Sequence, residues 1–329
     1  MNTEFDGLKA VHYQNADPGP RWVKDPEIAV NSEDPDDEAR TITPNVVRLS
    51  GGGYRMYYTG VGPGRPPLIA SESFLSAFSE HGDVWRKEPE SRLEITDVDD
   101  SQRILCPEVI PLPDGRFRMY WENKSVAGPS VILSAISADG MTWKQEPGIR
   151  FGDDKAEYGA PRCLYVKPAP SDGGRSGWQY RLYFHQYFYE SEPGSRKNII
   201  SAISDDGLHF EREGGVRIPQ TRPTESHATY APDVIRLGDG TYRMYYAGWT
   251  EDPTVKKGSP YNGRIFSATS DDGLEWVKDD GICLDIGGPW DPVKASEPCV
   301  IDLPDGRSRM FYEACDHEGK WRILSATSR

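Results

Sequence analysis

A short motif recurs five times along the chain, and this repetition constrains the fold more than any other feature. Each copy alternates aromatic or apolar residues with an arginine, as in Tyr54-Arg55-Met56-Tyr57-Tyr58. Recurrence at a nearly fixed period of this size is typical of repeat architectures. The copies begin at positions 54, 117, 180, 242 and 308 of the 329 residues, so one repeat is 62 to 66 residues long.

Each repeat has the pattern of a four-stranded antiparallel unit. A proline followed by a short apolar run predicts a buried first strand, and the motif itself, with its period of two, predicts the second. A Ser-Ala segment predicts the third strand. In the middle repeats an Asp-Gly turn and an aromatic residue then lead into a fourth, and four strands per repeat predict a propeller blade. The prolines are Pro44, Pro107, Pro161, Pro232 and Pro298.

The two ends of the chain predict a closed ring. The last repeat stops after its third strand, at Ser328-Arg329, whereas Trp22-Val23-Lys24-Asp25 matches the fourth strand of another repeat, Trp276-Val277-Lys278-Asp279. We expect a strand at about 20–30 to complete the fifth blade, which removes the open sheet edge. The sequence thus predicts an all-β, five-bladed β-propeller with four antiparallel strands per blade. It forms a single domain over residues 1–329, with blades at about 41–90, 104–150, 158–218, 229–284 and 295–329.

Composition excludes several classes of function. No run approaches eighteen apolar residues and the N-terminus shows no secretory signal, so no membrane span and a cytoplasmic location are expected. A formal net charge of −14 argues against nucleic acid and anionic membranes as partners. The odd number of cysteines favours small buried side chains over disulfides, and Cys106, Cys163 and Cys299 lie beside the repeat prolines. The histidines lack zinc-site spacing, so no cofactor is expected, although a structural divalent cation stays open.

Polar residues gather where the strands meet the long, variable loops, which is the face that usually carries function. The position after each proline is polar in four of five repeats, on strands that are otherwise apolar. Carboxylates, cations and aromatic rings in one funnel suit a sugar, although each of these residues also fits a solvated or paired structural role. The candidates are Glu108, Arg162, Asp233, Arg40, Arg103, Glu157, His227, Tyr230, Lys294, Glu297, Glu122, His185, Trp249 and Glu313.

The proline-led strands and the Ser-Ala-x-Ser-Asp-Asp-Gly-x-x-Trp segments resemble the five-bladed β-propeller glycosidases, which include glycoside hydrolase families 43, 32, 68 and 130. The resemblance covers the whole chain. It implies three carboxylates on the first strands of the first three blades, the first of them an aspartate before the first proline. One carboxyl must be protonated to assist the leaving group while another stays ionised. This sequence has Thr43, Cys106 and Ala160 before the first three prolines, so that aspartate is missing.

Other fragments do match the family. Tyr230-Ala231-Pro232-Asp233-Val234 is similar to the strand that carries the second carboxylate, and Ser296-Glu297-Pro298 to the strand that bears the acid. We therefore expect Asp233 as base or stabiliser and Glu297 as acid. Glu108 and Glu157 are the alternates. His227 and Tyr230 would position the substrate, and Arg103, Arg162 and Lys294 would hold an anionic group such as a uronate or phosphate.

Three functions remain open at this point. The first is an enzyme that cleaves a small carbohydrate or glycoside by hydrolysis, or by phosphorolysis with one carboxylate and a basic phosphate site. The second is a non-hydrolytic metabolite enzyme that performs a cyclisation, elimination or isomerisation. The third is a carbohydrate-binding propeller without catalysis. The funnel positions differ in every repeat while the scaffold recurs, which favours one asymmetric site and therefore an enzyme.

Overall fold

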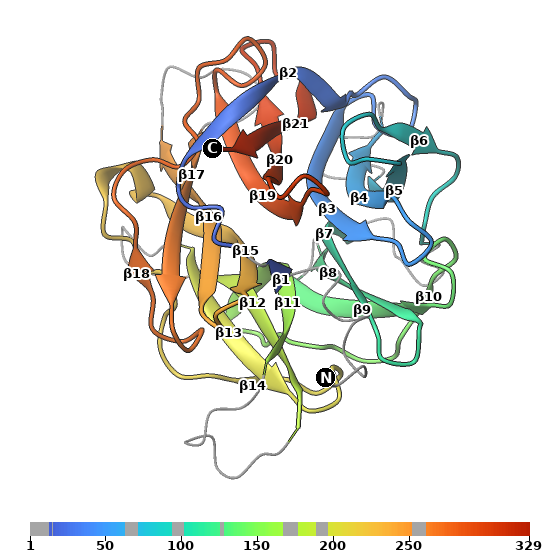
Figure 1. The fold of residues 1–329 in the computed structure, drawn as a ribbon. Coiled ribbons are helices and arrows are strands. Elements are labelled where there is room, and N and C mark those ends of the chain that lie inside the picture. The colour runs from blue at the N-terminus through green and yellow to red at the C-terminus, as the bar shows by residue number, and fades with distance from the viewer. Residues whose placement is uncertain are drawn as a thin grey trace.

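The computed structural model describes residues 13–14, 16–62, 72–93, 102–125, 128–166, 177–188, 197–251 and 261–329. They form three four-stranded sheets and one nine-stranded sheet, arranged around a common centre (Figure 1). The all-β class is confirmed, because strands supply nearly all of the regular structure in these ranges. None of the helices in the described ranges is long and apolar enough to cross a membrane.

Three sheets share one strand order, in which each strand pairs antiparallel with the next along the chain. The first sheet consists of β3 (Arg40–Arg48), β4 (Tyr54–Val61), β5 (Glu72–Ser79) and β6 (Arg86–Glu88). The second consists of β7 (Gln102–Pro111), β8 (Phe117–Ser125), β9 (Val131–Ser137) and β10 (Lys144–Gln145). The third consists of β11 (Ala156–Val166), β12 (Gln179–Phe188), β13 (Asn198–Ser204) and β14 (Glu211–Arg212).

The nine-stranded sheet contains the same order twice. One series is β15 (Ala228–Leu237), β16 (Tyr242–Glu251), β17 (Tyr261–Ser270) and β18 (Val277–Lys278). The other is β19 (Lys294–Asp302), β20 (Ser308–Cys315), β21 (Trp321–Ser328) and β2 (Trp22–Val30). A parallel bridge between Gly263 and Lys294 joins the two series. The short strand β1 (Tyr13–Gln14) runs parallel to β15, and the 3₁₀ turn η3 (Pro223–Glu225) precedes β15.

The N-terminal strand takes the place of the missing fourth strand of the last repeat. β2 runs antiparallel to β21, with Trp22 opposite Ser328 (Figure 1). Asp25 of β2 accepts hydrogen bonds from the hydroxyls of Ser325 and Thr327. The prediction that the N-terminal strand pairs with the C-terminal strand is therefore confirmed.

The repeated arginine and serine of the sequence share one structural role. In the first sheet, Arg55 donates to both carboxylate oxygens of Glu88, and Ser76 Oγ donates to Oε2 at 2.6 Å. A carboxylate of the fourth strand is thus held by the second and third strands through charge-assisted bonds. The corresponding triads are Arg118, Ser134 and Glu146; Arg181, Ser201 and Glu213; Arg243, Ser267 and Asp279; and Arg309, Ser325 and Asp25.

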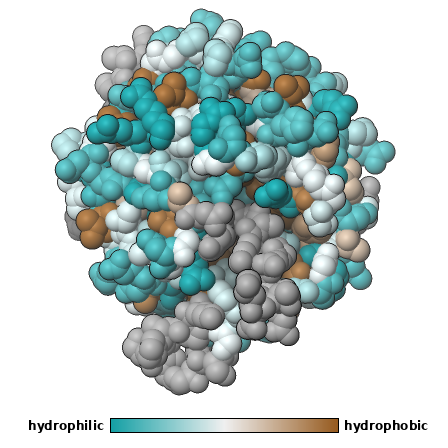
Figure 2. All heavy atoms as spheres, in the orientation of Figure 1, coloured by the Kyte–Doolittle hydropathy of each residue, from teal (hydrophilic) through white to brown (hydrophobic). Residues whose placement is uncertain are grey.

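The first strands of the series pack against one another at the centre. Each contacts the first strand of the next series, and β19 contacts β3. Apolar side chains of the second strands fill the space between the sheets and are fully buried, which provides the hydrophobic driving force for this arrangement. The five cysteines are free and buried, as the sequence predicts. The face seen in Figure 2 is mostly hydrophilic, with scattered apolar residues of the kind that is normal on a folded protein.

Candidate active site

Every first strand interrupts its regular pairing at its proline. The register with the second strand shifts there, and the residue before the proline has a positive φ. This backbone conformation costs a non-glycine residue about 1–2 kcal/mol and gathers at functional sites. A bulge of this kind re-aims the side chain of the residue. The five residues are Thr43 (φ 56°), Cys106 (55°), Ala160 (47°), Ala231 (48°) and Glu297 (52°).

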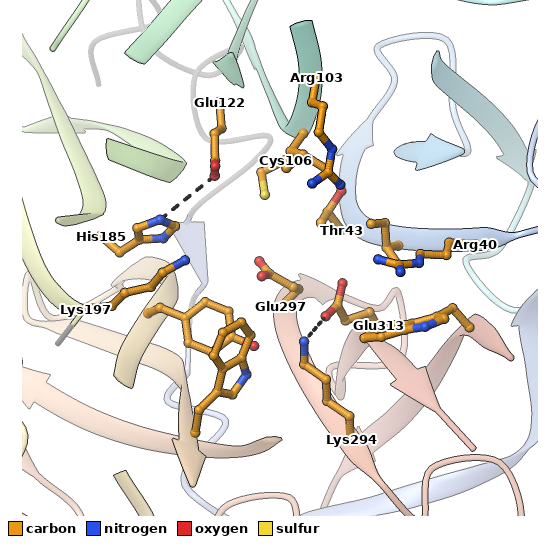
Figure 3. Close-up of a pocket in the computed structure, with 15 residues that line it drawn as sticks. Arg40, Thr43, Arg103, Cys106, Glu122, His185, Lys197, Lys294, Glu297 and Glu313 are labelled. Atoms are coloured by element: carbon orange, nitrogen blue, oxygen red, sulfur yellow. Dashed lines mark ion pairs between the residues drawn. The ribbon is translucent and has the colours of Figure 1, made fainter. Parts of the chain in front are cut away.

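Three of these bulge residues, Thr43, Cys106 and Glu297, line a cavity of about 150 Å³ (Figure 3). Side chains from the ends of other strands complete its wall. The predicted site residues that line it are Arg40, Arg103, Glu122, His185, Tyr230, Trp249, Lys294, Glu297 and Glu313. The other lining residues are Ile42, Leu105, Lys197 and Trp321.

Glu297 is the one carboxylic acid among the five bulge residues. Its side chain is 7% exposed and points into the cavity (Figure 3). No hydrogen bond or ion pair joins its carboxyl group to another described residue. Burial, together with the neighbouring Glu313 carboxylate, raises the pKa of Glu297 to about 8. Glu297 therefore holds a proton at neutral pH and can donate it to a ligand.

Lys294 and Glu313 form a buried ion pair next to Glu297. Lys294 Nζ lies 3.0 Å from Glu313 Oε1 (dashed in Figure 3). The same ammonium group lies 4.3 Å from the ring centroid of Trp249 and 4.8 Å from that of Trp321, within cation–π range. The pair therefore fixes a charged group beside Glu297 in a defined position.

Aromatic rings form a second part of the wall. The ring centroids of Tyr230 and Trp249 lie 4.0 Å apart, and the Trp321 ring also lines the cavity. Flat aromatic surfaces beside polar groups suit the mixed faces of a sugar ring. His227, predicted to position the substrate, is absent from the cavity lining, and its ring stacks on Trp249 at 6.3 Å.

Glu122 and His185 face each other at another edge of the cavity (Figure 3). His185 Nε2 lies 3.9 Å from Glu122 Oε2, and the Ser130 hydroxyl donates to Glu122 Oε1 at 3.3 Å. Burial raises the pKa of Glu122. Burial also lowers the pKa of His185 well below its usual value, and the ammonium group of Lys197 adds to this effect. His185 is therefore a neutral imidazole at neutral pH.

Cations surround the cavity. Arg103 Nε donates to Glu72 at 2.6 Å, whereas Arg40 lies over Trp321 at 5.4 Å and Lys197 over Trp249 at 5.5 Å. Among the residues that the structure describes, no carboxylate lies within ion-pair distance of Arg40 or Lys197. These two side chains are therefore placed to attract an anionic ligand.

Asp233, Glu108 and Arg162 lie outside the cavity lining, although the sequence favours them as site residues. Asp233 Oδ2 accepts a hydrogen bond from the Val300 N–H at 2.8 Å, and Glu108 Oε1 accepts one from the Cys163 N–H at 3.0 Å. Arg162 lies between the two carboxylates, 3.6 Å from Glu108 Oε2 and 3.4 Å from Asp233 Oδ1. All three side chains are buried and tie neighbouring first strands together. Catalysis by Asp233 or Glu108 stays a prediction that this geometry does not favour.

Glu157, the other predicted alternate, is also absent from the cavity lining. Its Oε1 lies 2.6 Å from Lys124 Nζ. Catalysis by Glu157 therefore stays a prediction that its position outside the cavity lining does not favour.

Sequence reasoning missed Lys197 and Trp321. Lys197 directly precedes β13 and Trp321 begins β21, so both stand at the start of a third strand. This position lies beside the end of a second strand, where His185 and Glu313 were expected. The hairpin geometry of the repeat was therefore a usable signal for both residues.

A metal site lacks support from the side chains that the structure places. In the described ranges, no group of three or more His, Cys, Asp or Glu residues is arranged to hold an ion. A structural divalent cation stays an untested prediction.

No family model matches the chain. It is 36% identical over 222 residues to the uncharacterized protein MT1551 of Mycobacterium tuberculosis, which covers 64% of this chain and 68% of that protein. A solved glycoside hydrolase superposes with a TM-score of 0.71 at 18% identity, covering 93% of this chain and 92% of that one.

Two further solved structures share the fold. A thermostable family-43 glycoside hydrolase gives a TM-score of 0.67 at 17% identity, covering 87% and 88% of the two chains. A structure from the family-130 mannoside phosphorylases and β-1,2-mannoside hydrolases gives a TM-score of 0.66 at 14% sequence identity. The match covers 99% of this chain and 95% of that one. The chain therefore belongs to the same family as the mycobacterial protein MT1551, and its fold is that of the β-propeller glycoside hydrolases.

Proposed function

We propose that the chain is a single five-bladed β-propeller, closed by β2, and that it is an enzyme that cleaves a glycosidic bond in the central cavity. Three four-stranded sheets and the two series of the nine-stranded sheet would supply the blades. The contacts between successive first strands, including that between β19 and β3, support a ring. In such a ring the asymmetric cavity is a place where side chains of several blades meet.

Glu297 is the observation that carries this proposal. A buried carboxyl group on a strained bulge, facing the cavity, with a pKa raised to about 8, suits a proton donor. It would protonate the glycosidic oxygen as the bond to the anomeric carbon breaks. Tyr230, Trp249 and Trp321 would hold the sugar ring. A volume of about 150 Å³ suits one small ring, so we propose a terminal sugar residue as the group bound.

The proposal predicts a specific pH dependence. The protonated form of Glu297 is the active one, so kcat/KM for a glycoside should fall as the pH rises through about 8. Glu297→Gln should abolish this alkaline limb and lower kcat/KM by about 10²- to 10⁴-fold. The loss should be larger for alkyl glycosides than for nitrophenyl glycosides, because nitrophenolate leaves without a proton.

A panel of nitrophenyl and alkyl glycosides, assayed between pH 5 and 10, measures this. The exposed Glu275, on the tight turn between β17 and β18 and outside the cavity lining, provides the control variant Glu275→Gln. Unchanged cleavage of alkyl glycosides by Glu297→Gln would refute the proton-donor role. No cleavage of any glycoside by the wild type would instead favour the non-hydrolytic or binding alternatives.

Phosphorolysis is the second candidate, and the unpaired charges of Arg40 and Lys197 within the described structure favour it. Phosphate held by these cations would attack the anomeric carbon in place of water. The same panel distinguishes the two reactions when it is run with and without phosphate. A phosphate-dependent rate with a sugar 1-phosphate product would assign phosphorolysis.

A further inference from the structure

We propose that His185 is the base that activates the attacking water, and that the neighbouring Glu122 carboxyl group stabilises the protonated imidazole that forms. The inference rests on the proposed glycosidic cleavage and adds the second half of its acid–base pair. Neither the missing family aspartate nor the carboxylates favoured by the sequence, Asp233 and Glu108, supply this function in the cavity.

The position of His185 carries the argument. It lies on β12, is 3% exposed and lines the cavity. Neither ring nitrogen has a hydrogen-bond partner in the described part of the chain. Buried polar atoms are normally paired, so a buried imidazole that faces a cavity in this state points to a ligand. In Figure 3, Glu297 lies between His185 and Glu313, so the sugar can have the acid on one side and the imidazole on another.

The backbone and a hydroxyl group accommodate the Glu122 carboxyl group beside His185. Its Oε2 lies 3.9 Å from His185 Nε2, which exceeds hydrogen-bond length and leaves the imidazole available. A Cβ on Gly159 would lie 1.8 Å from that oxygen, so only glycine leaves room for the carboxyl group. The Ser130 hydroxyl holds the other oxygen.

Charged groups from several elements surround His185. They are Glu122 and Lys124 on β8, Glu157 on β11, which pairs with Lys124, and Lys197 before β13, while the Tyr230 ring lies on β15. Burial and the two lysines lower the pKa of His185, whereas burial raises that of Glu297. Environments that push two pKa values apart in this way identify an acid and a base.

The reaction balances without another reactant. Water transfers a proton to the unprotonated nitrogen of His185 while its oxygen bonds to the anomeric carbon. The bond to the leaving oxygen breaks, and that oxygen takes the proton of Glu297. Solvent then removes the proton from His185 and returns one to Glu297. A single displacement of this kind inverts the anomeric configuration.

The experiment has two parts. It determines the anomeric configuration of the sugar that the wild type releases, and it measures the kinetics of variants that lack the His185 base. NMR of freshly released sugar should show inversion. His185→Ala and His185→Asn should lower kcat by about 10²- to 10⁴-fold with a much smaller change in KM. Azide needs no base, so it should restore turnover in His185→Ala and yield a glycosyl azide. Glu122→Gln should shift the acidic limb of the kcat/KM profile, which a merely structural role would not do.

His209→Gln is the matched control, since His209 is 86% exposed on a tight turn. Three results would overturn the assignment while glycosidic cleavage stands: retention of configuration, a phosphate-dependent wild type, or His185 variants that lose only substrate affinity. The anomeric configuration is measured with the wild type, so the proposal can be refuted even if a His185 variant fails to fold. If the wild type cleaves no glycoside, both the proposed function and this inference are refuted.

Discussion

Glu297 combines three features that each reduce the stability of a folded chain: a left-handed backbone, a buried carboxyl group and no hydrogen-bond partner among the described residues. The equivalent bulge residues differ. Thr43 donates its hydroxyl proton to Thr59 Oγ1 at 2.9 Å, and Ala160 and Ala231 carry no polar side-chain atom. The strain is thus common to all five strands, whereas the unsatisfied acid occurs at one, which is the expected signature of a functional residue.

Gly159 gives a residue-scale prediction. A Cβ at this position would lie 1.8 Å from Glu122 Oε2 and 2.9 Å from His185 Cε1, so Gly159→Ala must displace the carboxyl group. We expect a loss of about 1–3 kcal/mol in the free energy of unfolding, measured by urea denaturation, together with reduced glycoside cleavage. Gly214→Ala should change neither, because nothing lies within 4 Å of its Cβ. Wild-type stability and activity in Gly159→Ala would show that Glu122 does not occupy this place.

The first strands show why only part of the site was predictable at the scale of elements. The proline-led run, the motif strand and the N-terminal strand follow from apolar patterns, and the structure has β3, β4 and β2 at these places. The two-residue period of a strand does not reveal a bulge, however. The bulge of β19 turns Glu297, the residue before its proline, into the cavity, whereas Asp233, the residue after its proline on β15, bonds to the backbone of β19. A carboxylic acid before the repeat proline therefore reaches the cavity, whereas one after the proline is used in packing.

Residues after the prolines form a repeated hydrogen bond between their side chains and the backbone of a neighbouring first strand. Asn45 Oδ1 accepts from the Val109 N–H at 3.0 Å, as Asp233 does from Val300 at 2.8 Å. Asp233→Asn should therefore keep the hydrogen bond from the Val300 N–H but remove the negative charge that faces Arg162. We expect a folded protein whose free energy of unfolding falls by about 2–3 kcal/mol, with a change of only a few fold in kcat/KM.

The exposed Asp280 supplies the control, Asp280→Asn, which should match the wild type in denaturation and turnover. The opposite pattern in Asp233→Asn, with stability preserved and turnover reduced more than 100-fold, would restore Asp233 to the catalytic role that its sequence motif implies.

Across the whole molecule, neighbouring series are joined by the hydroxyl groups of the second strands. The Tyr57, Tyr120 and Tyr183 hydroxyls donate to glycine carbonyls in turns of the following series, at 2.7–2.8 Å. Tyr245 donates to the Gly19 carbonyl just before β2, so the N-terminal segment continues this series of contacts. The pairing of the N-terminal strand with the C-terminal strand was predictable because a strand match in the sequence reports the same geometry that these hydrogen bonds fix.

Trp22 tests whether the pairing of β2 with β21 supports the site. It is 8% exposed and packs edge-on against Tyr245 at 5.4 Å, so it joins β2 to the preceding series. Trp22→Ala should lower the free energy of unfolding by about 3–5 kcal/mol, whereas Val23→Ala, at a side chain 46% exposed, should change it by less than about 0.5 kcal/mol. Because β21 and β20 connect β2 to the strand that carries Glu297, cleavage should fail at a lower temperature as well. Equal denaturation midpoints for Trp22→Ala and the wild type would mean that the packing of Trp22 does not contribute to the stability of the fold.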